Sequence, residues 1–111
     1  MKHEEYAIQC AIIKQYRLAG MPDTFLFHPF NKASSPREGA RAKAMGVIPG
    51  VPDLIGCIDG RFYALEVKTE KGYLSENQQV CREALWDAGA SCDVGFGLEE
   101  CINRLKDRGF L

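Results

Sequence analysis

The chain has 111 residues, of which 46% are hydrophobic and 26% are charged. These proportions are typical of a single folded domain, here expected over residues 1–111, and they exclude a disordered chain. The longest apolar runs are far shorter than the ~18 residues of a membrane-spanning helix. The formal net charge is −1, which excludes a basic field over the whole molecule and leaves any contact with nucleic acid to local positive charge.

A helix and a strand are predicted near the N-terminus. The helix covers residues 3–19, because apolar side chains recur there at helical spacing and Gly20 follows as a natural stop. Its apolar stripe comprises Ile8, Ala11, Ile12, Tyr16 and Ala19. Residues 24–30 are aromatic and favour a strand, which should end at Pro29.

An irregular, locally basic segment follows over residues 31–52, which are rich in glycine, proline and serine. Within it, residues 37–45 are predicted to form a short helix. The stretch 32–43 holds four basic residues and one acidic residue, a local charge of +3. A solvated loop and a surface that contacts phosphates explain this charge equally well.

Residues 53–58 and 61–68 predict a β-hairpin. Both segments are rich in apolar and aromatic residues, and Asp59-Gly60 between them is a two-residue turn whose backbone suits the twist of paired strands. We therefore expect two antiparallel neighbours at the centre of a sheet.

The C-terminal part of the chain predicts a helix, a strand and a last helix. Ser75 and Gln78 form an S-x-x-Q capping box, from which a helix runs to about Ala88 and stops at Gly89. Residues 91–95 favour a short strand. The last helix has an apolar stripe of Leu98, Cys101, Ile102 and Leu105. The order α-β-(α)-β-β-α-β-α indicates an α/β fold, a mixed sheet flanked by helices.

The cysteines favour neither a disulfide scaffold nor a zinc knuckle. Their number is odd and no CxxC spacing occurs. We expect buried thiols in a reducing, cytoplasmic compartment. The five are Cys10, Cys57, Cys81, Cys92 and Cys101.

Two charged residues on the second hairpin strand point to chemistry. Residues i and i+2 of a strand share a face, about 6.6 Å apart along the chain, so Glu66 and Lys68 project together while Leu65 and Val67 face a core. The hairpin places Asp53 beside them. An exposed Glu-x-Lys ladder is the common alternative for such a pair alone, and the upstream Pro-Asp makes that alternative much weaker.

Two carboxylates held this close repel each other unless a cation binds between them or one takes up a proton. Oxygen ligands of this kind suit Mg²⁺ or Mn²⁺, which would polarise a phosphoryl oxygen and lower the pKa of bound water. Lys68 would neutralise developing charge and orient the attacking water. The pattern therefore predicts hydrolysis of a phosphodiester.

Two further positions carry alternatives. Gln78 flanks an expected buried stripe of Val80, Cys81, Ala84 and Leu85, from which it could hold Lys68 or a phosphate; its role in the capping box is the simpler explanation. Glu4 and Glu5 lie equally far from the centre of the first helix's stripe, and both also suit a helix N-terminus.

These residues resemble the VRR-NUC branch of the PD-(D/E)xK nucleases, in the stand-alone form of phages and bacteria. The resemblance covers most of the chain. It is carried by Gly50-Val51-Pro52-Asp53-Leu54, Glu66-Val67-Lys68, Lys71-Gly72-Tyr73-Leu74-Ser75, Gln78, the Glu5-x-x-Ile8-Gln9 pattern, and Asn31 after the first strand.

The resemblance implies roles for particular residues. The metal ligands would be Asp53, Glu66 and the backbone carbonyl of Val67, with Glu5 as a further acid. Lys68 and Gln78 would complete the catalytic set. Stand-alone members are implied to be homodimers that act on branched DNA in the manner of Holliday-junction resolvases. The segment expected to contact DNA comprises Asn31, Lys32, Arg37, Arg41 and Lys43.

Other interpretations remain open at this point. One keeps the nuclease but changes the substrate to a flap or to duplex cut in a restriction-like way; the other is a non-catalytic DNA-binding module of the same fold. His28 is expected to be a satisfied core or edge histidine rather than a catalytic one. Trp86 falls on the outer side of its helix, where a contact between subunits is as good an explanation as a lone surface residue.

Overall fold

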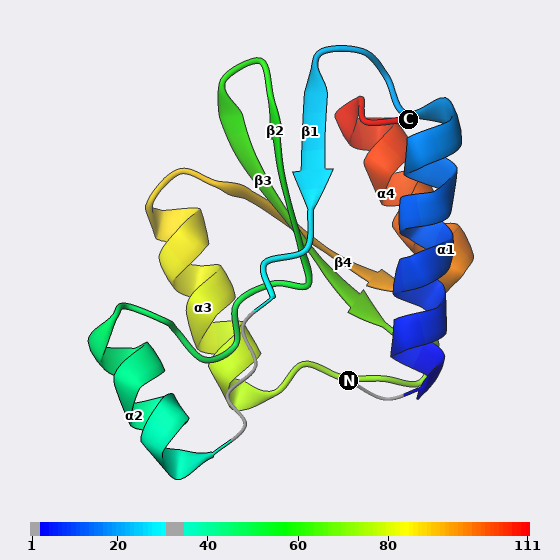
Figure 1. Ribbon diagram of the computed structural model, residues 1–111. Coiled ribbons are helices and arrows are strands. Elements are labelled where there is room, and N and C mark those ends of the chain that lie inside the picture. Colours follow the sequence, from blue (N-terminus) through cyan, green and yellow to red (C-terminus); the bar gives the residue numbers. More distant parts are fainter. Residues whose placement is uncertain (1–2, 31–34) are drawn as a thin grey trace.

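A computed structural model describes residues 3–30 and 35–111 (Figure 1). Their centre is a four-stranded sheet with the order β1-β2-β3-β4. The first three strands are antiparallel to their neighbours, and β4 runs parallel to β3, so the sheet is mixed as predicted. The strands are β1 (Thr24–Phe27), β2 (Leu54–Ile58), β3 (Arg61–Lys68) and β4 (Ser91–Phe96).

Helices cover both sides of this sheet. In Figure 1, α1 and α4 lie against one face, α3 lies on the other side, and α2 stands beyond α3 at the periphery. We call the side of α1 and α4 the core face and the other the α3 face. The helices are α1 (His3–Ala19), α2 (Pro36–Ala44), α3 (Glu76–Asp87) and α4 (Leu98–Arg108). None of the helices in the described ranges is both long and apolar enough to span a membrane.

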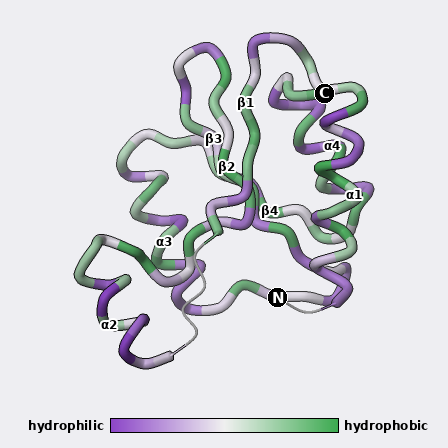
Figure 2. Tube along the Cα trace, viewed as in Figure 1, coloured by the Kyte–Doolittle hydropathy of each residue, from purple (hydrophilic) through white to green (hydrophobic). Residues whose placement is uncertain are grey.

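The hydrophobic core lies between the core face and the two helices. Alternate residues of β3, namely Tyr63, Leu65 and Val67, are all at most 1% exposed and pack there against Ile12 and Phe110. Figure 2 shows β1 as hydrophobic along most of its length, in contrast to the largely hydrophilic α2. The periodicity of two in β3 thus separates a dry side from a side free to carry polar groups.

Local signals place the element ends. Asp59 and Gly60 have φ values of 52° and 73°, the left-handed pair that a tight hairpin turn requires. The capping box forms as predicted, since the Ser75 hydroxyl accepts from the Gln78 amide and the Gln78 side chain accepts from the Ser75 amide. These two devices fix the register of the hairpin and the start of α3.

Two predictions about elements need correction. The first strand ends at Phe27, before the predicted end at Pro29, because pairing with β2 stops at Phe27–Ile55 and Pro29 cannot donate to a ladder. In α3, Val80 is 59% exposed and Ala84 is also exposed, against the predicted buried stripe. The helix is rotated so that its less exposed residues are Gln78, Cys81, Arg82 and Leu85.

The prediction of buried thiols holds for only part of the set. Cys92 and Cys101 are buried and Cys81 is half-buried, whereas Cys10 and Cys57 are exposed. Cys10 points away from the inner stripe of α1. Cys57 lies on the α3 face where no helix covers β2, so its strand position did not imply burial.

Candidate active site

The open end of the hairpin brings two carboxyl groups together. Leu54, the first residue of β2, pairs with Leu65 in the antiparallel hairpin, so Asp53 just before β2 lies beside Glu66 just after Leu65. The Asp53 Oδ2 atom accepts a hydrogen bond of 2.8 Å from the Val67 amide, and the Asp53 carboxyl is close enough to Glu66 to raise the pKa of the Glu66 carboxyl. Backbone pairing therefore holds Asp53 in position.

Glu66 and Lys68 are buried on the α3 face, at 1% and 7% exposure. They are the charged members of the buried set among the described residues. Burying a charge is costly unless it is paired or binds a metal. The same strand fills its core face with apolar side chains, so two buried charges in one place indicate a functional site.

The environment of Glu66 opposes its ionised form. Burial raises its pKa first, the hydrogen bond and negative charge of Asp53 raise it further, Glu5 adds a smaller effect, and Lys68 works in the opposite direction; together they raise the pKa to about 9. Glu66 Oε2 is also buried without a hydrogen-bond partner among the described atoms. The carboxyl therefore holds a proton unless a cation takes its place.

Gln78 contacts the site directly. Its Nε2 donates to Glu66 Oε1 at 3.1 Å, and its Oε1 accepts from the Ser75 amide at 2.9 Å. The capping role and the site role were alternatives from the sequence, and one amide serves both. Its contact in the structure is with Glu66, not with Lys68.

Of the two acids on α1, Glu5 is the one that bears on Glu66. Glu5 is half-buried and its charge raises the Glu66 pKa, whereas Glu4 is exposed. Both line a hollow of about 680 Å³ that also reaches Lys68 and Gln78. Within the described ranges, no three His, Cys, Asp or Glu side chains gather closely enough to hold a metal. Glu5 thus acts on Glu66 through its charge, and its role as a further metal ligand stays a prediction.

The residues present fit a hard divalent cation. Asp53 and Glu66 offer carboxylate oxygens at one place, and the Glu66 Oε2 atom has no hydrogen-bond partner among the described atoms. Mg²⁺ is commonly bound by only one or two carboxylates, with water and substrate phosphate completing its octahedron. Two acids and an adjacent lysine are therefore a sufficient protein contribution.

His28 is a neighbour of the site that sequence reasoning did not assign to it. It is exposed at the end of β1, and its Nδ1 donates to the backbone carbonyl of Asp53 at 2.6 Å. The contact joins residues 25 positions apart and depends on the pairing of β1 with β2. No local pattern around His28 contained this register.

The predicted DNA-contacting segment is only partly described. Asn31 and Lys32 lie outside the described residues. Arg37, Arg41 and Lys43 are all exposed on α2. Lys43 lines a second hollow that includes Asp53, so the basic helix stands beside the candidate site.

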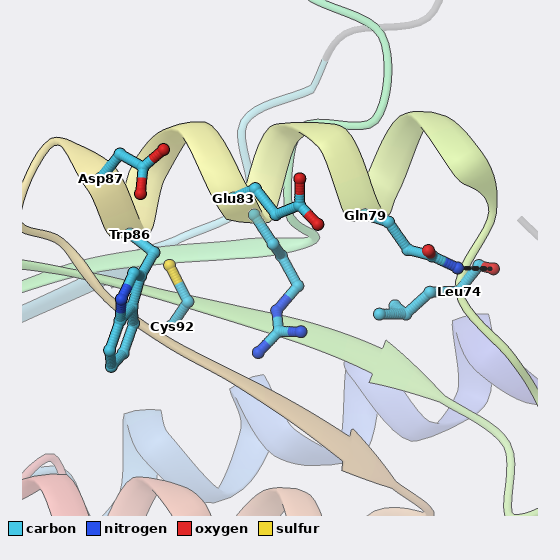
Figure 3. Close-up of a pocket in the computed structure, with 7 residues that line it drawn as sticks. Leu74, Gln79, Glu83, Trp86, Asp87 and Cys92 are labelled. Atoms are coloured by element: carbon cyan, nitrogen blue, oxygen red, sulfur yellow. Dashed lines mark hydrogen bonds between the residues drawn. The ribbon is translucent and has the colours of Figure 1, made fainter.

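A further hollow of about 580 Å³ lies along the other flank of α3 (Figure 3). Figure 3 shows Trp86 beside Cys92 of β4, with Asp87 directed away from them. Trp86 is 66% exposed, on the outer side of the helix as predicted. Neither Asp53, Glu66 nor Lys68 reaches this hollow, so it is not part of the site.

Comparison with known proteins agrees with this architecture. No family model and no curated protein matches the sequence. Among solved structures, one described as a "VRR_NUC domain protein" is similar with a TM-score of 0.79 and 25% identity, covering 96% of this chain and 88% of that one. Another, described as a "VRR_NUC domain", has a TM-score of 0.65 and 15% identity over 98% of this chain and 100% of that one. This similarity over nearly the whole chain shows that the chain has the mixed α/β, nuclease-type fold of VRR-NUC domains.

Proposed function

We propose that this chain is a divalent-metal-dependent endonuclease that hydrolyses DNA phosphodiester bonds. The observation that carries the proposal is the pair of half-buried Asp53 and buried Glu66 beside buried Lys68, in a domain whose structural neighbours are VRR-NUC domains. A buried charged cluster of this kind lowers stability, so it needs a functional reason.

Asp53, Glu66 and the Val67 carbonyl would hold Mg²⁺ or Mn²⁺. When bound, such an ion supplies Lewis acidity and lowers the pKa of a coordinated water. Gln78 positions the Glu66 carboxylate through its 3.1 Å hydrogen bond. Lys68 lines the hollow, where its ammonium would neutralise charge on the phosphate and orient the attacking water. Glu5 lines the same hollow and adds negative charge near the ion.

A non-catalytic DNA-binding module of the same fold is the alternative of a different class. Its binding surface would not need Glu66 buried at 1% exposure with an unpartnered oxygen. Thermal unfolding with and without Mn²⁺ separates the two: a nuclease gains stability on binding the ion at Asp53 and Glu66, and the gain is lost in Asp53→Asn. An unchanged midpoint in the wild-type protein favours the binding module.

We further infer that branched DNA is the preferred substrate and that the enzyme is a homodimer. A two-fold dimer presents two sites to two strands, which suits a four-way junction. An apolar surface is available for it, because Phe25, Phe27 and Phe62 are 63%, 42% and 41% exposed on the α3 face beyond the reach of α3. A flap nuclease or a restriction-like nuclease is the alternative within the same chemistry.

The test is cleavage of a four-way junction, a flap and a linear duplex in Mg²⁺ and Mn²⁺, with mass measurement of the protein in solution. Glu66→Gln should abolish cleavage while binding in a gel shift largely survives, and Glu83→Gln, on the exposed side of α3, serves as the matched control. Equal cleavage by Glu66→Gln and wild type contradicts the proposed site. Preferential cleavage of the flap or of the duplex would identify that DNA, and not the junction, as the preferred substrate.

A further inference from the structure

A second hollow adjoins the candidate site at Asp53, is not lined by Glu5, and has a different character. Its volume is about 650 Å³, within the range of small-ligand sites. It is lined by α2, by residues 28–30 after β1, and by residues 47–53 before β2, which include Asp53. The residues that matter below are His28, Phe30, Lys43, Val47, Ile48 and Asp53. We call it the aromatic hollow.

The lining of the aromatic hollow is mostly apolar although it is open to water. Phe30 is 79% exposed and Ile48 is 57% exposed, and Val47 lies between α2 and Ile48. Large apolar side chains gathered in one open concave place are typical of a binding site rather than of a solvated loop. The hollow around Glu5 and Lys68, by contrast, is lined mainly by charged and polar groups.

The aromatic wall is tied to the backbone of Asp53. The rings of His28 and Phe30 pack edge to face, with centroids 6.2 Å apart and an interplanar angle of 76°. The same His28 ring donates to the Asp53 carbonyl. Because Phe30 and Asp53 line the same hollow, an occupant stacked on Phe30 would adjoin a phosphate held at Asp53.

The opposite wall is equally defined. Gly50 has a φ of 81° and approaches the backbone of Asn77 so closely that a side chain at this position would overlap it. This contact seats the loop carrying Ile48 against the start of α3. Lys43 adds a positive charge to the lining. The hollow thus combines an aromatic surface with a cation, the two features that single-stranded nucleic acid requires of a protein.

We propose that the aromatic hollow binds one unpaired base of the DNA strand whose phosphate lies at Asp53, with the base stacked on Phe30 and Lys43 contacting a neighbouring phosphate. This inference rests on the proposed nuclease function and names the feature of the substrate that is selected. The polar side chains of the lining are few, and His28 already donates to Asp53, so the hollow tolerates any base. A base paired within a duplex cannot enter, and selection falls on strands whose stacking is interrupted, as at a branch point.

The test is a cycle that removes the ring, the base, or both. Binding to a four-way junction is measured in the Glu66→Gln background, where cleavage does not interfere, with Phe30 or Ala at position 30 and with either an intact or an abasic nucleotide at each position next to the cleaved phosphate. At one position, loss of the base and Phe30→Ala should each weaken binding about tenfold, and the double change should be no worse than either alone. Phe30→Trp should restore binding of the intact strand.

Met45→Ala is the matched control, since Met45 is 84% exposed at the end of α2 and does not line the hollow. It should leave binding unchanged. Additive effects of Phe30→Ala and base removal at every position overturn the proposal, as does an equal loss with Met45→Ala. Cleavage by the wild-type protein tests the nuclease proposal separately. If the wild type cleaves DNA but the effects of Phe30→Ala and base removal are additive, only the base-binding proposal is wrong. If the effects are non-additive but the wild type does not cleave DNA, only the nuclease proposal is wrong.

Discussion

The two faces of β3 make opposite use of one strand. On the core face, Tyr63, Leu65 and Val67 are sealed between the sheet and helices α1 and α4. On the α3 face, Glu66 and Lys68 are almost as deeply buried. Glu66 accepts a hydrogen bond from the Gln78 amide, and Lys68 lines an open hollow. Burial therefore does not distinguish a core from a site; the chemistry of what is buried does.

Alternation along the strand explains how both faces coexist. Neighbouring side chains point to opposite sides, so residues one position apart belong to environments that share a backbone but little else. The Asp53 carboxylate, which belongs to the candidate site, accepts a hydrogen bond from the backbone amide of Val67, while the Val67 side chain packs in the core. Changes on the two faces should therefore separate into effects on cleavage and effects on folding.

The largest effect is expected from Lys68→Ala, measured as the rate of junction cleavage at saturating protein. Loss of a charge that stabilises the developing phosphate charge should reduce the rate by about 10³-fold. The midpoint of thermal unfolding should change little, because Lys68 opens onto a hollow rather than a packed core. A fall in unfolding midpoint that accounts for the lost activity contradicts the separation of faces.

Leu65→Ala is the counterpart on the core face. Leu65 is 0% exposed, and truncation leaves a cavity, so the free energy of unfolding should fall by about 2–5 kcal/mol. Urea denaturation measures this loss. Cleavage per folded molecule should stay near the wild-type rate at a temperature where the variant is folded. A variant as stable as wild type would show that the core face is not tightly packed.

Glu66→Gln should stabilise the metal-free protein, and the size of this stabilisation should increase with pH. The folded-state pKa of about 9 lies above the ordinary value of 4.5, so the stabilisation linked to protonated Glu66 is fully present below about pH 4.5 and is lost as pH rises through 9. The two proteins should unfold alike near pH 4. At pH 8 the variant should be more stable by about 1–4 kcal/mol.

Mg²⁺ provides the complementary measurement for the same variant. The ion should raise the unfolding midpoint of wild type at pH 8 and leave Glu66→Gln nearly unchanged. An equal metal response in both proteins would place the ion elsewhere.

Tyr63→Phe is expected to have the smallest effect. The Tyr63 hydroxyl donates to Asp93 Oδ2 at 2.8 Å, and Arg108 forms two hydrogen bonds to the same carboxylate. Burial alone would raise the Asp93 pKa, but these partners hold it below its ordinary value. Removing the hydroxyl should cost about 1 kcal/mol above pH 4, and the cost should shrink as Asp93 protonates at lower pH. Urea denaturation at pH 7 and pH 3 checks it.

The parts of the molecule that sequence reasoning predicted well depend on local geometry. The Asp59-Gly60 turn sets the hairpin register, and that register alone brings Asp53 to Glu66. The capping box likewise sets Gln78 at a defined place in the first turn of α3. The elements of the fold and the placement of the carboxylates therefore followed from short-range patterns; their catalytic roles stay predictions.

The parts that were missed or wrong depend on contacts between distant segments. His28 meets Asp53 only because β1 pairs with β2, and the buried side of α3 was misassigned because Gln78 turns toward Glu66 in place of Val80 turning inward. Hydrophobic periodicity assumes that apolar residues face inward. At a functional site a polar contact sets the rotation of the helix, and the periodicity then misleads.

The double hydrogen bond of Gln78 makes the first turn of α3 a reporter of the site. One end of its amide ties down the Ser75 backbone and the other ties down Glu66, so fraying of the helix start and loosening of the carboxylate are a single event. Occupancy at Glu66 should therefore slow amide hydrogen exchange at Ser75, which precedes α3 and does not lie on β3. Substitutions in the loop before α3 would in this way change how rigidly the Glu66 carboxyl is held without changing Glu66 itself.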